Sequence, residues 1–499
     1  TQETTDEHSF KVLEPYSDGF RNFHTIETII NKYEIKKIYS TNDKNENFTT
    51  NNWQSLHYSS NSEKWISNLN CKILKFLAPN KEIEIIKNFK LDDRKRNDII
   101  KKNFLNNGFL NSAIKFYNFF KNNINFKNEI FFYESGLNLL SEKKIEILLG
   151  QIPAFRKFPD YNYKDYIDYN LRESLKIDFE AENKFELFLQ RIIKISLPRY
   201  IIEEFKHISS ILNNIKLPQN INSIITGTGF VNEFFNIYTA KNVSKGKKYL
   251  ILQHGNGYHT HYPNDYLVEY QTADHFISWG AKIKNSDIPA FNIKTIKINN
   301  KFNLKGNLSI VCNKILCRAL PHDFFFEKEK YMLNTINFAK NLSKNIKEKT
   351  YFRFFPNNEE YNQNFKRILS ENNIKIYKDL TPFSQILRKT RICIFNYDST
   401  GFYENLNNQI PSILYLDDPF LESNEKFIND FLLLQKSKMI FSNQTDLHQH
   451  LNSIWDDPLS WWYDNTTQQA IDSFNEKLNI PSNGKMNKLI KILKNIRNN

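Results

Sequence analysis

The chain has 499 residues, a length that exceeds what one hydrophobic core usually supports. Its residues are 40% hydrophobic and 15% aromatic, a composition that excludes a disordered or fibrous protein. Its 68 Lys and Arg against 55 Asp and Glu give a net charge of +13, which suits nucleic acid, an anionic membrane surface or a negatively charged substrate. No RNP, zinc-finger or helix-turn-helix pattern accompanies this charge, so no nucleic-acid partner is expected, and peripheral contact with an anionic membrane surface is favoured instead.

The cellular compartment is predicted from the cysteines and the apolar runs. No CxxC pair occurs, and buried thiols in a reducing cytoplasm are the preferred interpretation of Cys71, Cys312, Cys317 and Cys393. No apolar run approaches the roughly 18 residues that span a bilayer, and the polar start from Thr1 to His8 does not resemble a signal peptide. We therefore expect a cytoplasmic protein, with the inner face of the cytoplasmic membrane as an alternative place of action.

The first half of the chain is predicted as an α/β domain with a helical insertion. Short apolar runs between Lys11 and Thr41 predict a strand, helix, strand unit, and helical spacing from about residue 68 to 205 predicts a helix-rich insertion. After Pro218 the pattern predicts a strand at 221–225, a turn at 226–229, a helix at 233–242 and strands at 248–253 and 275–279. This alternation indicates a parallel sheet with crossover helices, and the polar residues 281–305 are interpreted as an interdomain connection.

The second half repeats the alternation of strands and helices. Strands are predicted at 308–316, 350–355, 374–377, 391–395, 412–416 and 438–441, and helices at 327–343, 361–371, 382–390, 400–407 and 424–435. Helices at 445–455 and 462–478 and a basic tail from Lys485 follow. This predicts a second doubly wound α/β domain.

Two such domains facing a cleft make up the GT-B fold, which is the predicted fold class. The predicted boundaries are 1–300 for an acceptor-side domain, 301–465 for a donor domain, and 466–499 for helices that pack back on the domain interface. No GxGxxG or GxxxxGK[ST] motif occurs, so hydride transfer and P-loop phosphoryl transfer lose support.

A glycine-rich turn follows the strand predicted at 248–253. Its residues are Gln253, His254, Gly255, Asn256, Gly257 and Tyr258. Ligands collect at the carboxyl ends of parallel strands, and glycines let backbone amides approach an anionic group, so we expect a site here. His254 could donate to a phosphate or sugar hydroxyl, or take a proton from an acceptor; the alternative is a turn whose histidine caps a helix.

Histidines and carboxylates continue after this turn, at His259, His261, Asp265, Glu269 and Asp274. Their spacing lacks the HExxH or CxxC geometry of a metal site, so no metal is expected. One of the carboxylates could act as a general base for the attacking hydroxyl, and solvated loop charges are the alternative.

Two groups of residues in the second half suit a phosphate. One follows the strand at 391–395 and comprises Asn396, Tyr397, Asp398, Ser399, Thr400 and Gly401, with Glu404 in the helix beyond. Hydroxyls and N–H groups at a helix N-terminus bind phosphate, although Ser399 or Thr400 could equally be an ordinary N-cap. The other is Arg353 with Pro356, where Arg353 is predicted to bind a phosphate or carboxylate, an exposed ion pair being the alternative.

The motifs together resemble a family of bacterial surface-carbohydrate transferases typified by a leptospiral protein. The resemblance is carried by QHGNGYH, ADHFISWG, TGTGF, NEFF and RICIFNYDSTGFYENLNNQIPSILY, over about residues 197–470, and more faintly by NSEKWISNL. The downstream block is also similar to CDP-glycerol glycerophosphotransferases and to Kdo or capsule transferases. This resemblance implies a GT-B fold, a reaction without metal or cofactor, and a donor bound mainly by the C-terminal domain.

Site residues follow from the resemblance by position. His254 and Gly255 match the histidine-glycine turn, Ser399 and Thr400 the donor-phosphate hydroxyls, and Glu404 the helix glutamate. The chain departs from the resemblance in two places. Arg353 and Pro356 stand where sialyltransferase-like enzymes have a His-Pro pair, and Tyr258 is followed by His259 where the family usually has glycine.

The expected function is a glycosyltransferase of capsule or lipopolysaccharide synthesis, with a nucleotide sugar and a glycan acceptor as partners. The base is predicted among His254, Glu233, Asp265 and Glu269, with Arg353 and the Ser399–Thr400 helix end stabilising the leaving phosphate. A CMP-linked acidic sugar, Kdo or a nonulosonic acid such as pseudaminic acid, is the expected donor, because a basic cleft suits its two anionic groups. The alternatives are a CDP-glycerol-type polyol-phosphate transferase and a non-catalytic glycan-binding protein.

Overall fold

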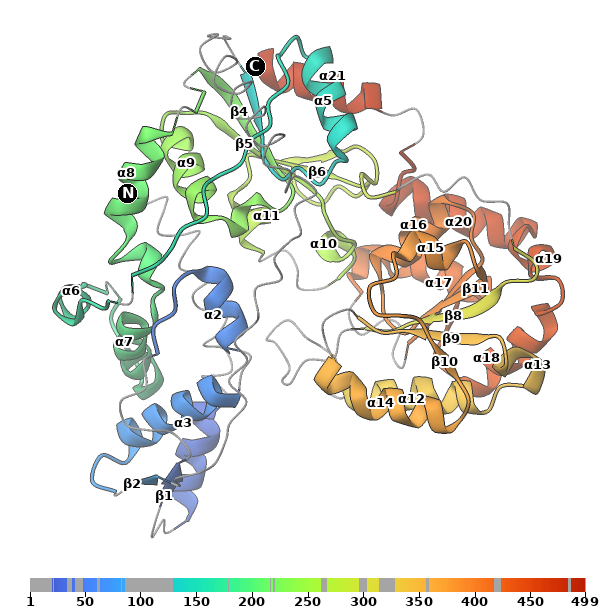
Figure 1. Cartoon of the computed structure of the whole chain (residues 1–499), viewed down its shortest axis with the longest axis horizontal. Coiled ribbons are helices and arrows are strands. Elements are labelled where there is room, and N and C mark those ends of the chain that lie inside the picture. Colours follow the sequence, from blue (N-terminus) through green and yellow to red (C-terminus); the bar gives the residue numbers. More distant parts are fainter. Residues whose placement is uncertain are drawn as a thin grey trace. The chain divides into compact units, whose positions relative to one another are not determined.

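The computed structural model describes residues 20, 22–33, 38–40, 48–60, 63–81, 83–85, 129–164, 166–177, 179–215, 217–218, 220–261, 267–295, 303–313, 328–355, 359–416, 423–482 and 486–498. The chain divides into two compact units (Figure 1). Unit 1 comprises Thr1–Tyr133, Gly150–Ile224 and Thr228–Tyr249, and unit 2 comprises Glu134–Leu149, Ile225–Gly227 and Leu250–Asn499. The domain boundaries predicted at residues 300 and 465 stay predictions.

A five-stranded sheet has the order β3-β4-β5-β6-β7. Its strands are β3 (Glu129–Phe132), β4 (Ile221–Thr226), β5 (Lys248–Leu252), β6 (His275–Ser278) and β7 (Asp287–Pro289). Helix α9 (Glu233–Val243) connects β4 to β5, and β5 pairs with β6, and β6 with β7, in parallel. The strand, helix, strand order predicted after Pro218 is therefore confirmed.

Two strands of this sheet were not predicted from the sequence. The predicted interdomain connection contains β7, a short strand whose Asp287 and Pro289 lack the β-branched pattern of a central strand. The predicted helix-rich insertion contains β3, whose four residues are all buried. Four residues are too few to establish a period of two against the helical spacing around them, which explains why this strand was not predicted.

Helices dominate the rest of unit 1. They are residues 22–32, α2 (Trp53–Ser60), α3 (Glu63–Leu77), α6 (Tyr169–Ser174), α7 (Lys184–Ser196) and α8 (Phe205–Asn214). A parallel pair of short strands, β1 (Ile38–Ser40) and β2 (Ile83–Ile85), accompanies them. The strand predicted near Lys11 lies outside the described residues. A cluster that includes Phe23, Trp65 and Phe188 forms the core, so burial of these aromatic rings stabilises the helices.

The second sheet lies in unit 2 and is parallel throughout, in the order β10-β9-β8-β11-β12-β13. Its strands are β8 (Asn307–Val311), β9 (Thr350–Arg353), β10 (Lys375–Ile376), β11 (Thr390–Phe395), β12 (Ser412–Tyr415) and β13 (Ile440–Phe441). All six strands were predicted, with ends that differ by a few residues. The second α/β domain is thus confirmed.

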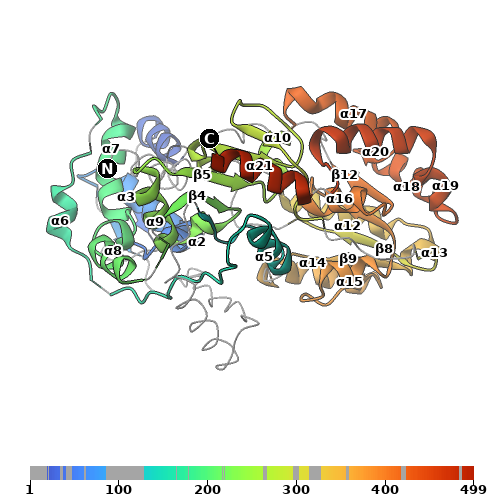
Figure 2. The same cartoon turned by 90° about the horizontal axis from the view of Figure 1, so that it is seen from above.

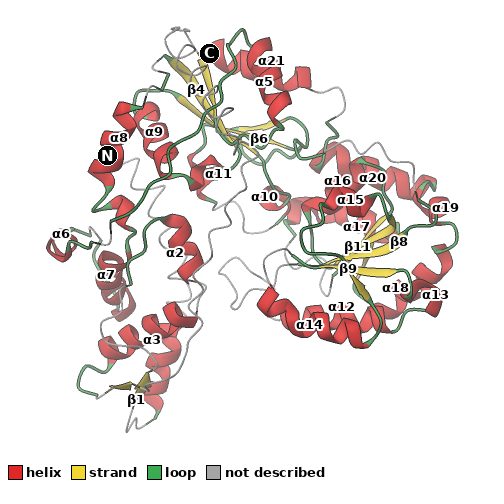
Figure 3. Ribbon diagram, viewed as in Figure 1, coloured by secondary structure: helices red, strands yellow, loops and turns green. Residues whose placement is uncertain are grey.

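Helices cover both faces of this second sheet (Figures 2 and 3). Ile392 and Ile394 of β11 pack with α12 (Lys328–Lys340), α14 (Glu359–Glu371) and α18 (Gln444–Ile454). Cys393 and Phe395, which alternate with them, pack on the opposite face with α16 (Thr400–Asn407), α17 (Ile428–Lys436) and α20 (Asn465–Leu478). Because successive strand residues point to opposite faces, a continuous apolar strand needs helices on both sides.

The remaining α-helices described in unit 2 are α5 (Leu139–Leu148), α10 (Gly257–Thr260), α11 (Val268–Thr272), α13 (Lys344–Lys347), α15 (Phe383–Leu387), α19 (Pro458–Trp462) and α21 (Met486–Asn498). From Met486 the predicted basic tail forms α21, within the region predicted to be helical, and its lysines alternate with a buried apolar stripe that includes Leu489 and Leu493. Trp455 and Trp462 are core residues.

The cysteines and the helices bear on the predicted compartment. Cys71, Cys312 and Cys393 are free and buried, as predicted, whereas Cys317 lies outside the described residues. Within the described ranges, no helix combines the length and the apolar character that a membrane crossing requires.

Candidate functional site

Gln253 fixes the start of the glycine-rich turn at the carboxyl end of β5. Its side-chain oxygen accepts from the backbone N–H of Trp279 at 2.7 Å, and its backbone carbonyl accepts from the Trp279 indole at 2.9 Å. The amide nitrogen of Gln253 donates to the carbonyl of Gly255 at 2.7 Å. Gln253 and Trp279 are both buried, so the two bonds between them hold the turn firmly against the end of β6.

His254, Tyr258 and Glu269 form a chain of hydrogen-bonding side chains in this turn. The hydroxyl of Tyr258 donates to Glu269 Oε1 at 2.9 Å and lies 2.9 Å from His254 Nδ1. Burial lowers the pKa of His254, while the charge of Glu269 and a bond to the backbone at Gly227 act in the opposite direction. A tyrosine hydroxyl both donates and accepts, so it can pass a proton between an imidazole and a carboxylate. The structure thus brings together two of the predicted bases.

His259 belongs to a different cluster. Its Nε2 lies 3.2 Å from Asp287 Oδ2, which also accepts from the Tyr270 hydroxyl at 2.8 Å and from the backbone N–H of Ile283 at 2.8 Å. Burial would raise the pKa of Asp287, but the bonds from His259 and from nearby backbone N–H groups outweigh it and lower that pKa. Because His259 is almost fully buried in this cluster, it anchors α10 to β7.

His261 closes the turn against the helix start predicted to bind phosphate. Its Nε2 lies 2.7 Å from Asp398 Oδ2, and the hydroxyl of Tyr403 donates to the same oxygen at 3.3 Å. Beside this pair the Thr400 hydroxyl donates to Asn256 Oδ1 at 3.2 Å. Two motifs more than a hundred residues apart therefore meet within unit 2.

This arrangement does not support a metal site at His259 and His261, because His259, His261 and Glu269 each bond to a different side chain. Asp265 lies outside the described residues. Across the described ranges, no three His, Cys, Asp or Glu side chains are grouped so that they could hold a metal ion. The absence of a metal stays a prediction.

Ser399 is the N-cap of α16, as the alternative interpretation of this segment predicts. Its side chain accepts from the N–H of Gly401 at 3.1 Å. A Cβ at Gly401 would lie 3.0 Å from the Phe395 ring and 3.2 Å from the Phe383 ring, so glycine allows the first turn of α16 to approach β11. Upstream, the buried Asn396 accepts from the N–H of Asn313 at 2.7 Å and fixes the end of β8.

Arg353 lies at the carboxyl end of β9. Its guanidinium is 5.3 Å from the centre of the Phe383 ring. Among the described residues its side chain has neither a hydrogen bond nor an ion pair, so the predicted alternative of an ion-paired arginine is not met there. Pro356 lies outside the described residues. Arg353 is therefore a cation stacked on an aromatic ring beside the start of α16, which is an arrangement suited to an anion.

Glu404 and Lys294 influence each other's pKa without forming an ion pair, and only Glu404 was singled out from the sequence. Burial raises the pKa of Glu404 to about 7, and the charge of Lys294 opposes that rise. Burial lowers the pKa of Lys294, and the charge of Glu404 opposes that fall. Lys294 also adds to the lowering of the His254 pKa. A single lysine in a lysine-rich chain carries no sequence signal, and Lys294 was missed for that reason.

The raised pKa of Glu404 predicts that the stability of the folded chain depends on pH. Because its pKa is about 7 in the folded chain against an ordinary 4.5, folding favours the neutral acid, and this stability is present at low pH and lost as pH rises through 7. We expect Glu404→Gln, whose amide stays neutral, to gain stability relative to wild type between about pH 4.5 and 7 and to keep a constant difference above that. Urea unfolding across this range measures the difference, with the exposed Glu371→Gln as control. A difference independent of pH would contradict the shifted pKa.

Glu233, the remaining predicted base, lies in unit 1. Asn232 caps α9 by accepting from the N–H of Phe235 at 3.0 Å, which places Glu233 in the first helical turn. Burial raises the pKa of Glu233, against the effect of nearby Tyr163 and Asn52. His254 and Glu269 belong to unit 2, so Glu233 does not join them in the same unit.

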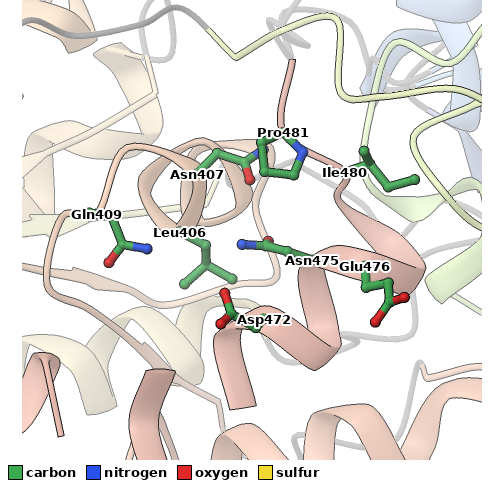
Figure 4. Close-up of a pocket in the computed structure, with 8 residues that line it drawn as sticks. All are labelled: Leu406, Asn407, Gln409, Asp472, Asn475, Glu476, Ile480 and Pro481. Atoms are coloured by element: carbon green, nitrogen blue, oxygen red, sulfur yellow. The ribbon is translucent and has the colours of Figure 1, made fainter. Parts of the chain in front are cut away.

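A separate pocket of about 400 Å³ lies at the other end of α16 (Figure 4). It is lined by Leu406, Asn407, Gln409, Asp472, Asn475, Glu476, Ile480 and Pro481. None of the predicted site residues lines it. We place the candidate site at the Gln253 turn and the start of α16 because hydrogen bonds connect the chemically suited groups there.

The comparison with solved structures gives distant matches. HepE of Anabaena with UDP is 10% identical, covering 74% of this chain and 100% of that one with a TM-score of 0.39, and MurG of Acinetobacter baumannii is 10% identical, covering 74% and 99% with a TM-score of 0.38. The wall teichoic acid polymerase TagF is 11% identical and covers 78% and 92%, with a TM-score of 0.37. Such distant likenesses carry no argument about ligands. No curated protein matches the chain.

The family comparison extends over most of the chain. The LIC12162 family transferases match residues 16–493, which includes both sheets and all the motifs above. This confirms the resemblance inferred from the sequence, and the two parallel sheets with their helices fit the predicted α/β, GT-B fold class. The chain is a transferase and belongs to the LIC12162 family.

Proposed function

We propose that this transferase is a glycosyltransferase of bacterial surface-glycan synthesis that uses a nucleotide-activated sugar. The observation that carries the proposal is the meeting of two motifs within unit 2. The bonds from His261 to Asp398 and from Thr400 to Asn256 bring the turn with His254 next to the start of α16. A proton acceptor and a phosphate-binding helix start are the two halves that glycosyl transfer needs.

In the proposed reaction, a hydroxyl of the acceptor glycan attacks the anomeric carbon of the donor sugar. The hydroxyl proton passes to His254, and the chain through Tyr258 lets Glu269 share it. The bond from the sugar to the nucleotide phosphate breaks, and its electrons remain on the phosphate. Arg353 and the N-terminus of α16 are suited to stabilise that charge, because a cation and oriented N–H groups act without reorganising.

The donor is proposed to be a CMP-linked acidic sugar such as Kdo or pseudaminic acid, for capsule or lipopolysaccharide. The net charge of +13 supports a donor that carries both a carboxylate and a phosphate. The cytoplasmic location and the absence of a metal requirement stay predictions.

The experiment is a titration of the full chain with CMP, CDP, UDP and GDP, followed by calorimetry or thermal unfolding. We expect CMP to bind most tightly and to raise the unfolding temperature, as any ligand of the folded state must. Stabilisation by UDP or GDP alone would exclude a CMP donor but keep the glycosyltransferase. Preference for CDP with a phosphate-linked product would indicate the polyol-phosphate transferase, and no binding of any nucleotide would contradict the proposed function.

A further inference from the structure

The segment that carries Lys294 is held rigidly after β7. The buried Asn292 donates its backbone N–H to the carbonyl of Ile480 at 2.8 Å and its side-chain N–H to Asn479 at 2.8 Å. The backbone N–H of Lys294 donates to Asn292 Oδ1 at 2.8 Å. On the other side, Asn407 donates to the hydroxyl of Thr295 at 3.0 Å. The backbone of Lys294 is thus fixed by bonds before and after it.

The ammonium group of Lys294 is partly buried among groups of the candidate site. It lies within electrostatic range of Glu404 in α16 and of His254 in the turn after β5. Gly136, which follows β3 and has a φ of 80°, makes room for it, because a Cβ there would lie 3.3 Å from Lys294 Nζ. The lysine is therefore directed to the end of β5 that bears His254.

This ammonium group has no partner within the described part of the chain. No hydrogen bond joins Lys294 Nζ to another described residue, and no carboxylate lies within the 4.0 Å of an ion pair. The charge of Glu404 raises the pKa of Lys294, yet the Glu404 carboxylate does not contact the ammonium group. Partial burial of a cation without a partner costs free energy, and an anionic ligand that supplies the missing charge offsets this cost.

We propose that Lys294 binds an oxyanion of the substrate, a phosphate or a carboxylate, beside His254. The inference rests on the proposed function only in taking the ligand to be a substrate of that site. The oxyanion could belong to the donor, as its phosphate, or to an acidic acceptor, as a sugar phosphate or carboxylate. In either case Lys294 contributes a cation from the segment after β7, and Arg353 acts from the end of β9 in the same unit.

The test compares Lys294→Met, which removes the charge and keeps the length, with Lys294→Arg, which keeps the charge. The exposed Lys282→Met, twelve positions earlier, is the matched control. The probes are the nucleotide that binds best, its uncharged nucleoside, inorganic phosphate and glucuronate. We expect Lys294→Met to weaken the binding of one or more of the anions about 10- to 100-fold and Lys294→Arg to weaken it less. The uncharged nucleoside should bind all variants with the same affinity.

The pattern of losses separates the two sources of the oxyanion. If only the affinity for the nucleotide falls, the oxyanion is the donor phosphate. If only the affinity for phosphate or glucuronate falls, the oxyanion belongs to the acceptor. Both results support the proposal. Equal binding of every anion to wild type and Lys294→Met, or no binding of any anion to wild type, would overturn it. If nucleotides fail to bind but phosphate or glucuronate responds to Lys294→Met, the proposed donor is wrong while the oxyanion site stands.

Stability gives an independent check that the variant is informative. Removing an unpartnered, partly buried charge without changing the packing should leave the unfolding temperature of Lys294→Met equal to or above that of wild type. A clear fall in the unfolding temperature would show that Lys294 is a structural partner of the fold, which would also overturn the proposal.

Discussion

Replacing His254 by glutamine is expected to lower the rate of transfer by about 10²- to 10⁴-fold, the usual contribution of a positioned acid or base. Glutamine fills a similar volume and can still bond to Tyr258, but it cannot take a proton. Nucleotide affinity should change little, because the phosphate groups are assigned to Arg353 and the start of α16. The measurement is kcat with the donor identified by titration, beside the dissociation constant of the nucleotide.

The same variant should change the pH profile. Burial lowers the pKa of His254, so the neutral imidazole that can accept a proton persists below the pH at which an ordinary histidine becomes charged. In wild type the acid limb of kcat/KM is therefore expected below pH 6.5, and His254→Gln should lose that limb. Tyr258→Phe, which interrupts the chain to Glu269, should leave His254 active with a smaller loss of rate.

The exposed His207→Gln in α8 is the matched control and should be as active as wild type. A His254→Gln enzyme with undiminished kcat would exclude His254 as the base. Loss of rate in Glu269→Gln with full rate in Tyr258→Phe would assign the base to Glu269 directly, because the tyrosine would then not be needed to carry the proton.

The parts of the fold that were predictable are those whose local pattern agrees with their burial. The residues Thr390–Phe395 of β11 are buried on both faces, so a run of apolar residues identified the strand directly. Helix α16 was predicted with its observed bounds, because Ser399 provides the capping oxygen and Gly401 the close approach. Local sequence and tertiary packing select the same structure in these segments.

The parts that were not predictable depend on long-range contacts. His259 and His261 are two residues apart and look equivalent in the sequence, yet one bonds to Asp287 and the other to Asp398. Only the meeting of the Gln253 turn with α16 distinguishes them. Lys294 is placed by Asn292, which is itself held by residues near 480, so no pattern within ten residues could reveal it.

The position of Arg353 leads to the second prediction of large effect, on donor binding. Arg353→Met is expected to weaken nucleotide affinity about 10- to 100-fold, since a hydrogen bond to a charged group contributes about 1.5–3 kcal/mol and each 1.4 kcal/mol is tenfold. Arg353→Lys should recover part of that loss, because an ammonium keeps the charge but not the planar fork that stacks on Phe383. Isothermal titration with the nucleotide measures the dissociation constants of wild type and of both variants.

Arg367→Met is the matched control for Arg353, because Arg367 on α14 is exposed and only 3.9 Å from its i+4 partner Glu371. Arg367→Met should bind the nucleotide with the affinity of wild type. That result would show that lowering the net charge by one does not by itself weaken binding. Equal nucleotide affinity in Arg353→Met and Arg367→Met would remove Arg353 from the donor site. The stacked arginine would then be a packing residue for α15, and its loss would appear in the unfolding free energy instead of the dissociation constant.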